Sequence, residues 1–311
     1  MTVQPGSGRT DRPAAIIDAH HHVWDLRNDL PWLKQERIPF RYGDYSSICR
    51  DYMPEDYRID TADWPLVGSV YVEAEWNRTL AAVETQWVTD IARQTGVPSV
   101  MVAWCDFASP IAAELLERHS ASDIVRGVRH KPAAAAAPQQ ARRGAEGSMD
   151  DPKWRDGYAR LKDYGWSYDL QTPWWHLDAA AEFARDFPDI PLIINHSGLP
   201  ADRSPEGLTG WRNAIEHASM QPNILIKISG LGQPGEPWNS EANRPIIRDI
   251  ISIFSVDRAM FASNFPVDSL VGSFDTIFSG FVTATADLPE EDRAKLFCDN
   301  AARVYRLPHA R

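Results

Sequence analysis

The feature that most constrains the fold is a series of short apolar runs, rich in β-branched residues, that recur along the whole sequence. The runs are too short for helices and lack the alternating polar residues of a strand with one exposed face. Parallel strands that are covered on both faces have this character. The eight candidate strands are residues 14–19, 67–74, 99–105, 124–129, 166–171, 191–196, 223–229 and 259–263.

Helical patterns separate most of these strands. Residues 79–95 repeat apolar side chains at close to 3.6 residues per turn, and Gly96 then ends the pattern. Strands that alternate with helices predict a parallel sheet, and eight such strands in 311 residues predict an α/β fold, a single distorted (β/α)8 TIM barrel. A doubly wound open sheet is the alternative architecture. The other candidate helices are residues 110–119, 153–164, 176–187, 209–220, 243–254 and 289–303.

Two long insertions interrupt the alternation. Residues 27–60 follow the first strand and are rich in aromatic side chains, and residues 131–150 follow the fourth strand. Long connections that leave the carboxyl ends of barrel strands commonly form the rim of the active site. Residues 1–15 are polar and lack the apolar region of a signal peptide, so we expect a disordered lead-in ahead of a barrel domain over residues 16–311.

Charge and cysteine content narrow the choice of partners and compartment. The net charge is −11, which disfavours nucleic acid and anionic membrane surfaces. No apolar run approaches the ~20 residues of a membrane span. The three cysteines, Cys49, Cys105 and Cys298, are far apart and odd in number, which is typical of a reducing compartment. We therefore expect a cytoplasmic protein, as a monomer or a homo-oligomer, whose partner is a small-molecule substrate.

Three consecutive histidines, His20, His21 and His22, close the first strand. Because side chains alternate along a strand, His20 and His22 point to one side, and we expect His21 to pack behind the strand. Two neutral imidazoles on one face can chelate a single cation such as zinc, iron or manganese. His196 also ends an apolar strand, where a barrel presents side chains to its substrate.

Charged residues close several other strands. Glu73 ends the second strand, with Glu75 two residues later on the same side, and Asp169 ends the fifth strand. A carboxylate that is partly buried at a barrel mouth is a candidate general base, because desolvation raises its pKa towards neutrality. Arg129 and Lys227 are candidates to hold an anionic or oxygen-rich substrate.

Aromatic residues follow the fifth strand directly. Trp174 and Trp175 offer flat faces that suit sugar rings or planar lactones, and His176 is a candidate to orient the substrate. Packing within the loop is the alternative role for all three side chains.

The order and spacing of these motifs resemble the amidohydrolase superfamily, in particular its amidohydrolase-2 branch, over residues 16–306. That branch includes lactone hydrolases that act on sugar lactones and on pyrone dicarboxylate, and some decarboxylases. The resemblance implies a TIM barrel, and it implies that His20, His22 and His196 hold one divalent cation, zinc being the first candidate. The matching stretches are the His20–His22 motif, Arg126-Gly127-Val128-Arg129-His130, Trp154-Arg155-Asp156-Gly157-Tyr158, Ser167-Tyr168-Asp169-Leu170, Ile194-Asn195-His196-Ser197-Gly198, Lys227-Ile228-Ser229-Gly230-Leu231 and Phe261-Ala262-Ser263-Asn264-Phe265-Pro266.

The sequence departs from the family pattern at the end of the last strand. Family members carry an aspartate there that binds the metal and takes a proton from the attacking water, whereas this chain has Asn264. An amide is a weak, neutral metal ligand and cannot act as a general base. The base is therefore open among Asp268, Glu73 and Asp169, and Asn264 is assigned to substrate binding. Catalysis without a metal is the alternative to a weakened metal site.

These features predict a hydrolase that opens a small lactone bearing hydroxyl or carboxylate groups, by attack of water on the carbonyl. His196 serves either as a metal ligand or as a catalytic residue. Two alternatives stay open. One is a metal-dependent decarboxylase that uses the same histidines, and the other is a non-catalytic barrel that binds a small molecule, which Asn264 favours.

Overall fold

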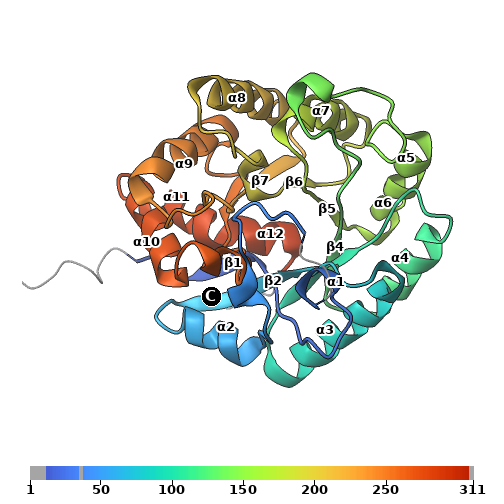
Figure 1. The fold of residues 1–311 in the computed structure, drawn as a ribbon, viewed down its shortest axis with the longest axis horizontal. Coiled ribbons are helices and arrows are strands. Elements are labelled where there is room, and N and C mark those ends of the chain that lie inside the picture. The colour runs from blue at the N-terminus through green and yellow to red at the C-terminus, as the bar shows by residue number, and fades with distance from the viewer. Residues whose placement is uncertain (1–11, 35–37, 308–311) are drawn as a thin grey trace, which may run out of the picture.

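The computed structural model describes residues 12–34 and 38–307. Eight parallel strands lie in the order β1 to β8, and helices surround them (Figure 1). The predicted (β/α)8 barrel is therefore confirmed. The strands are β1 (Ile16–His21), β2 (Leu66–Val72), β3 (Val100–Trp104), β4 (Val125–His130), β5 (Ser167–Leu170), β6 (Leu192–Ile194), β7 (Ile224–Ile228) and β8 (Ala259–Phe261).

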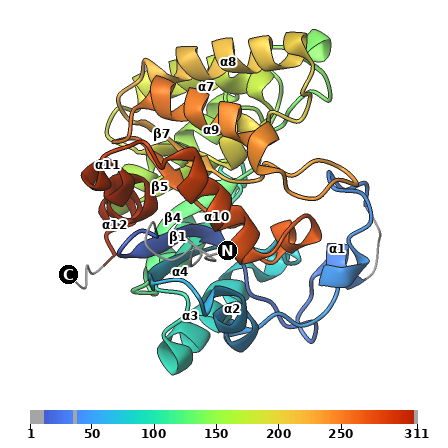
Figure 2. The ribbon, with the colours of Figure 1, turned by 90° about the vertical axis from the view of Figure 1, so that its left-hand side faces the viewer.

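Most helices lie outside the ring of strands, as Figures 1 and 2 show from two directions. The first insertion and the turns after β2 contain α1 (Pro31–Lys34), α2 (Pro54–Thr61) and α3 (Ala81–Thr95). The later helices are α4 (Ala112–Ser120), α5 (Pro152–Ala159), α6 (Leu161–Tyr164), α7 (Leu177–Asp186), α8 (Pro205–Ser219), α9 (Ser240–Phe254), α10 (Phe274–Ala284), α11 (Glu290–Ala294) and α12 (Asn300–Tyr305).

Three of these helices, α1, α2 and α10, were not among the sequence predictions, and α1 has a single turn of four residues, too short for a visible period. Helix α2 lies at the end of the aromatic insertion, and only three of its eight residues are buried, so its apolar periodicity is weak. Helix α10 buries Phe274, Ile277, Phe278 and Phe281 at helical spacing, so its apolar period was present in the sequence and the prediction overlooked it. Long, strongly amphipathic segments such as α3, which ends at Gly96 with φ of 77°, were located correctly.

The segment after β8, rather than β8 itself, closes the barrel against β1. The amide of His22 donates to the carbonyl of Phe265 at 2.7 Å, and the amide of Asn264 donates to the carbonyl of His20 at 2.8 Å. The buried carboxylate of Asp18 in β1 reinforces this seam, because it accepts bonds from the amide and the hydroxyl of Ser263. The barrel closure thus sets His20 and Asn264 next to each other.

The barrel interior is filled by alternate side chains of the strands. Ile17, Val70, Val102, Leu225 and Met260 form part of this buried cluster. Tyr305 of α12 belongs to the same cluster and is fully buried. The C-terminal helix therefore contributes a side chain to the barrel interior. A barrel filled in this way is a packed core, and room for a ligand remains at the strand ends.

The predicted N-terminal lead-in, residues 1–15, is described from Arg12 onwards. Residues 1–11, most of the predicted lead-in, lie outside the described residues, whereas Arg12 pairs with Asp275 at 2.7 Å and lies over the ring of Trp64. Across residues 12–34 and 38–307, no helix has the length and apolar character needed to cross a membrane.

Candidate active site

A cavity of about 240 Å³ lies at the carboxyl ends of the strands. Its wall includes His22 after β1, Arg129 in β4, His196 after β6 and Asn264 after β8. The insertion after β1 covers the opening with apolar side chains, among them Trp32 and Phe40, whose rings stack 6.0 Å apart. The carboxyl end of a barrel is where catalytic groups from different strands meet, so this cavity is the candidate active site.

Three of the predicted histidines converge beside this cavity. The ring centroids of His20 and His22 are 5.0 Å apart, and those of His20 and His196 are 4.6 Å apart. His21 points the other way and stacks on Tyr57 of α2 with 4.2 Å between centroids. Strand alternation and barrel closure together therefore select His20, His22 and His196 from the histidines of the chain.

Hydrogen bonds orient two of the three rings. Nδ1 of His22 lies 2.7 Å from the carbonyl oxygen of Val72, which can only accept, so Nδ1 carries the proton and Nε2 of the neutral ring is an acceptor. Nδ1 of His196 lies 3.0 Å from the hydroxyl of Ser229. Within the described part of the chain, both ring nitrogens of His20 are buried without a hydrogen-bond partner.

The local environment keeps these imidazoles uncharged. Burial and then the charge of Arg129 lower the pKa of His22 to about 3. Burial and then the charge of Lys227 hold the pKa of His20 well below its usual range. Burial and then Arg41 do the same to the pKa of His196. The rings are therefore neutral hydrogen-bonding groups near pH 7.

Asn264 is held in place by the carboxylate that follows it in the sequence. Its amide nitrogen donates to Oδ1 of Asp268 at 2.6 Å, and its backbone has φ of 58°, a left-handed conformation that asparagine tolerates. Asp268 also accepts from the hydroxyl of Tyr42 at 3.0 Å and from Arg41 at 3.3 Å. Burial raises the pKa of Asp268, and Arg41 opposes this rise.

The other two candidate bases, Glu73 and Asp169, are buried inside ion pairs. Glu73 accepts from Arg129 at 2.7 Å, so the pKa of this buried carboxyl is held far below its usual range. Asp169 accepts from Lys227 at 2.5 Å, and both side chains are fully buried. Neither carboxylate lines the cavity, and neither does Lys227. The structure places these groups behind the wall of the site, where they set its shape and charge.

The aromatic group after β5 lies apart from the histidines. The indole of Trp175 donates to the carbonyl of Ala135 at 3.0 Å, and Nε2 of His176 accepts from the amide of Ala135 at 2.9 Å. Trp174 lies close to Gly210 of α8, where a Cβ atom would come within 2.5 Å of its ring. None of the three lines the cavity. In this structure Trp175 and His176 anchor the insertion after β4, whereas Trp174 lies against α8.

The cavity also contains residues that sequence reasoning missed. Arg41 comes from the insertion after β1 and reaches Asp268, 227 residues away in the sequence. Gln171 follows β5 and accepts from Arg129 at 3.4 Å. A basic residue within an aromatic insertion was the available signal for Arg41, whereas Gln171 has no distinguishing motif.

The fold is a (β/α)8 barrel, and imidazoles converge at the carboxyl ends of β1 and β6. These features place the protein among the barrel enzymes whose active sites are built from strand ends and loops. The amidohydrolase family model matches residues 17–307, so the chain belongs to the amidohydrolase family. The resemblance drawn from the motifs is thereby confirmed.

Two relatives and one solved structure cover nearly the whole chain. An uncharacterized protein, y4mH, of Sinorhizobium fredii is 39% identical over 94% of this chain and 99% of its own length. An L-fucono-1,5-lactonase of Burkholderia multivorans is 26% identical over 95% of this chain and 97% of its own. A crystal structure of an amidohydrolase from Burkholderia multivorans with bound zinc has a TM-score of 0.78 at 25% identity, covering 94% of this chain and 100% of that one.

The donor set of this chain does not fit a metal site of the family kind. Asn264 stands where the metal-binding aspartate is expected, and its amide nitrogen is directed to Asp268. The charges of Lys227 and Arg129 act on His20 in the direction that also repels a dication. Over residues 12–34 and 38–307, no group of three or more His, Cys, Asp or Glu side chains is arranged to hold a metal ion.

Proposed function

We propose that this protein hydrolyses a small lactone, with His22 as the general base. The observation that carries the proposal is the bond from Nδ1 of His22 to the carbonyl of Val72, because it leaves Nε2 of a neutral ring as an acceptor beside the cavity. The L-fucono-1,5-lactonase among the relatives supports a lactone as the substrate.

In this mechanism His22 accepts a proton from water as the water oxygen attacks the lactone carbonyl carbon. The carbonyl oxygen becomes an oxyanion, which needs donors fixed in advance. Asn264 offers one, because its amide nitrogen has two hydrogens, of which Asp268 takes one, and its side chain also contacts the ring of His22. Arg41, in the same wall, offers a cationic donor.

The ring then opens when the bond between the carbonyl carbon and the ring oxygen breaks. The proton held by His22 passes to that departing oxygen, which leaves a hydroxyl group, and the other product group is a carboxylic acid that ionises near pH 7. Water is consumed and no carbon dioxide is released. These two features separate the proposed reaction from a decarboxylation.

The test is the His22→Ala variant, assayed by acid release from a panel of sugar lactones. A general base contributes roughly 10²- to 10⁴-fold, so we expect kcat/KM to fall at least about a hundredfold. His217→Asn is the matched control, because His217 lies on the exposed face of α8 and pairs with Asp178. A loss below tenfold in His22→Ala would contradict the role of His22.

The same panel distinguishes the two alternatives. Release of carbon dioxide without net consumption of water would indicate a decarboxylase. No turnover of any lactone, together with thermal stabilisation by one of them, would indicate a binding protein.

A further inference from the structure

The acidic side chain that lines the candidate site, within residues 12–34 and 38–307, is Glu75. Among the described residues that line the cavity, Glu75 is the only acidic one. It follows β2 in a left-handed conformation with φ of 58°, as His196 and Asn264 do after their own strands. Non-glycine residues hold this conformation at some energetic cost, and such residues cluster at functional sites.

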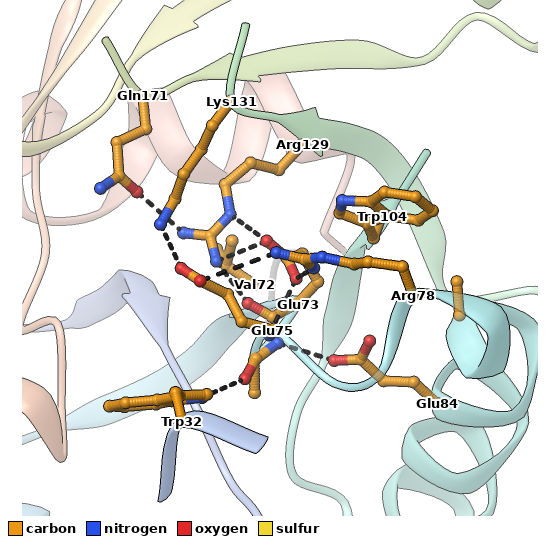
Figure 3. Close-up of polar contacts among 12 residues, drawn as sticks. Trp32, Val72, Glu73, Glu75, Arg78, Glu84, Trp104, Arg129, Lys131 and Gln171 are labelled. Atoms are coloured by element: carbon orange, nitrogen blue, oxygen red, sulfur yellow. Dashed lines mark hydrogen bonds and ion pairs between the residues drawn. The ribbon is translucent and has the colours of Figure 1, made fainter. Parts of the chain in front are cut away.

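Neighbouring contacts fix the turn that presents Glu75. Its amide donates to Oε2 of Glu73 at 2.9 Å, and the indole of Trp32 donates to the carbonyl of Ala74 at 3.0 Å. The Glu75 side chain pairs with Lys131 and lies 3.6 Å from Arg78, as Figure 3 shows. Both members of the Glu75–Lys131 pair are about one-third exposed, at 32% and 38%, whereas Glu73 is 1% exposed.

Each cation among the described lining residues has a carboxylate partner: Arg41 pairs with Asp268, Arg129 with Glu73 and Lys131 with Glu75. Arg78, which is not among these lining residues, also pairs with Glu73 and Glu75. An anionic ligand would have to compete with these carboxylates, and Glu75 would repel it directly. A hydroxyl group, in contrast, can donate to the carboxylate and accept from the ammonium at the same time.

The size and the aromatic lining of the cavity agree with this polarity. The volume of about 240 Å³ is at or below the small end of ligand pockets. Trp32 and Phe40 also line the cavity and add an apolar surface, which suits the carbon–hydrogen face of a sugar ring.

We infer that Glu75 and Lys131 determine specificity: they bind adjacent hydroxyl groups of an uncharged, polyhydroxylated lactone and reject a lactone that carries a carboxylate. This inference rests on the proposed function, because it assigns the substrate class of the same site. Glu75 selects by accepting a hydroxyl hydrogen and by repelling negative charge, and Lys131 completes the contact as a donor.

The experiment uses two lactones that differ in a single group. The γ-lactone of D-gluconic acid has a terminal CH₂OH, and the γ-lactone of D-glucaric acid has a carboxylate at that carbon. Acid release serves as the measure of hydrolysis. Isothermal calorimetry measures the affinity separately, and the heat of any turnover is included in the fit. The variants are Glu75→Gln, Lys131→Met and the control Glu55→Gln, which alters an exposed glutamate of α2.

We expect Glu75→Gln to shift the preference at least about tenfold towards the glucaric lactone, because a like charge is removed. Lys131→Met should shift it in the opposite direction, and Glu55→Gln should leave it unchanged. Shifts below about threefold in both site variants would overturn the inference while lactone hydrolysis by the wild type still stood.

Calorimetry measures the binding preference independently of hydrolysis. Wild-type binding of the gluconic lactone without turnover, with the preference reversed in Glu75→Gln, would support the specificity assignment and refute the hydrolase. Failure of the wild type to bind either lactone would overturn both.

Discussion

Replacing Lys227 by methionine isolates a buried charge whose surroundings are fully defined. Lys227 and Asp169 are both completely buried, and their Nζ and Oδ1 atoms are 2.5 Å apart. Removing one partner of such a pair typically costs 3–5 kcal/mol, because the remaining charge is left without compensation. Asp169 keeps two other donors, the hydroxyl of Tyr305 at 2.9 Å and the amide of Asn195 at 3.0 Å. We therefore expect Lys227→Met to lower the free energy of unfolding by about 3 kcal/mol, the low end of that range.

The double variant Lys227→Met with Asp169→Asn should recover much of this loss, since it removes the uncompensated charge as well. Lys162→Met is the matched control. Its ion pair with Asp189 has the same 2.5 Å separation but is largely exposed, so its removal should change the free energy of unfolding far less than Lys227→Met does.

Unfolding in urea, followed by circular dichroism and tryptophan fluorescence, measures all four proteins. The reasoning is refuted if Lys227→Met loses less than about 1 kcal/mol, or if the double variant is less stable than Lys227→Met alone. Lys227 does not line the cavity, so any remaining folded enzyme should show a KM close to that of the wild type.

Three further outcomes follow from the site. The free energy of unfolding should fall as the pH drops below about 6, because the unfolded histidines bind protons near pH 6.5 while the native ones do not. Each such histidine contributes a loss of about 1.4 kcal/mol per pH unit, and urea midpoints at pH 5 and 7 measure the sum of these losses. The histidines concerned are His20, His21, His22 and His196. The kcat/KM for a lactone should show no protonation step between pH 5 and 8, since the pKa of His22 is about 3; an acid limb near pH 6.5 would argue against His22 as the base. Treatment with a chelator should leave most of the activity, because Asn264 replaces a charged ligand; metal analysis showing one zinc per chain, with activity lost on its removal, would contradict this.

Much of the fold follows from local patterns that the sequence displays. The period of two along strands predicts that His20 and His22 share a side, and the period of 3.6 locates helices such as α3. Helix α10 shows the same period, with Phe274, Ile277 and Phe281 buried, and was nevertheless not predicted. The position of His196 at a strand end also follows from an apolar run and its boundary.

The partners of the charged side chains depend instead on contacts between distant segments. Glu73, Asp169 and Asp268 are equivalent candidates for a base when read along the chain. Folding pairs Glu73 with Arg129, 56 residues away, and Asp169 with Lys227, 58 residues away. Among the residues that the structure describes, the carboxylate left facing the cavity is Glu75.

The sequence alone thus determined the barrel, the family and the histidine group, because each rests on a repeat or a motif within a short segment. Only the tertiary structure decided which charges are neutralised and which remain accessible to a ligand. The physical reason is that the cost of burying a charge depends on its partner in space, and that partner is supplied by a strand or insertion elsewhere in the chain.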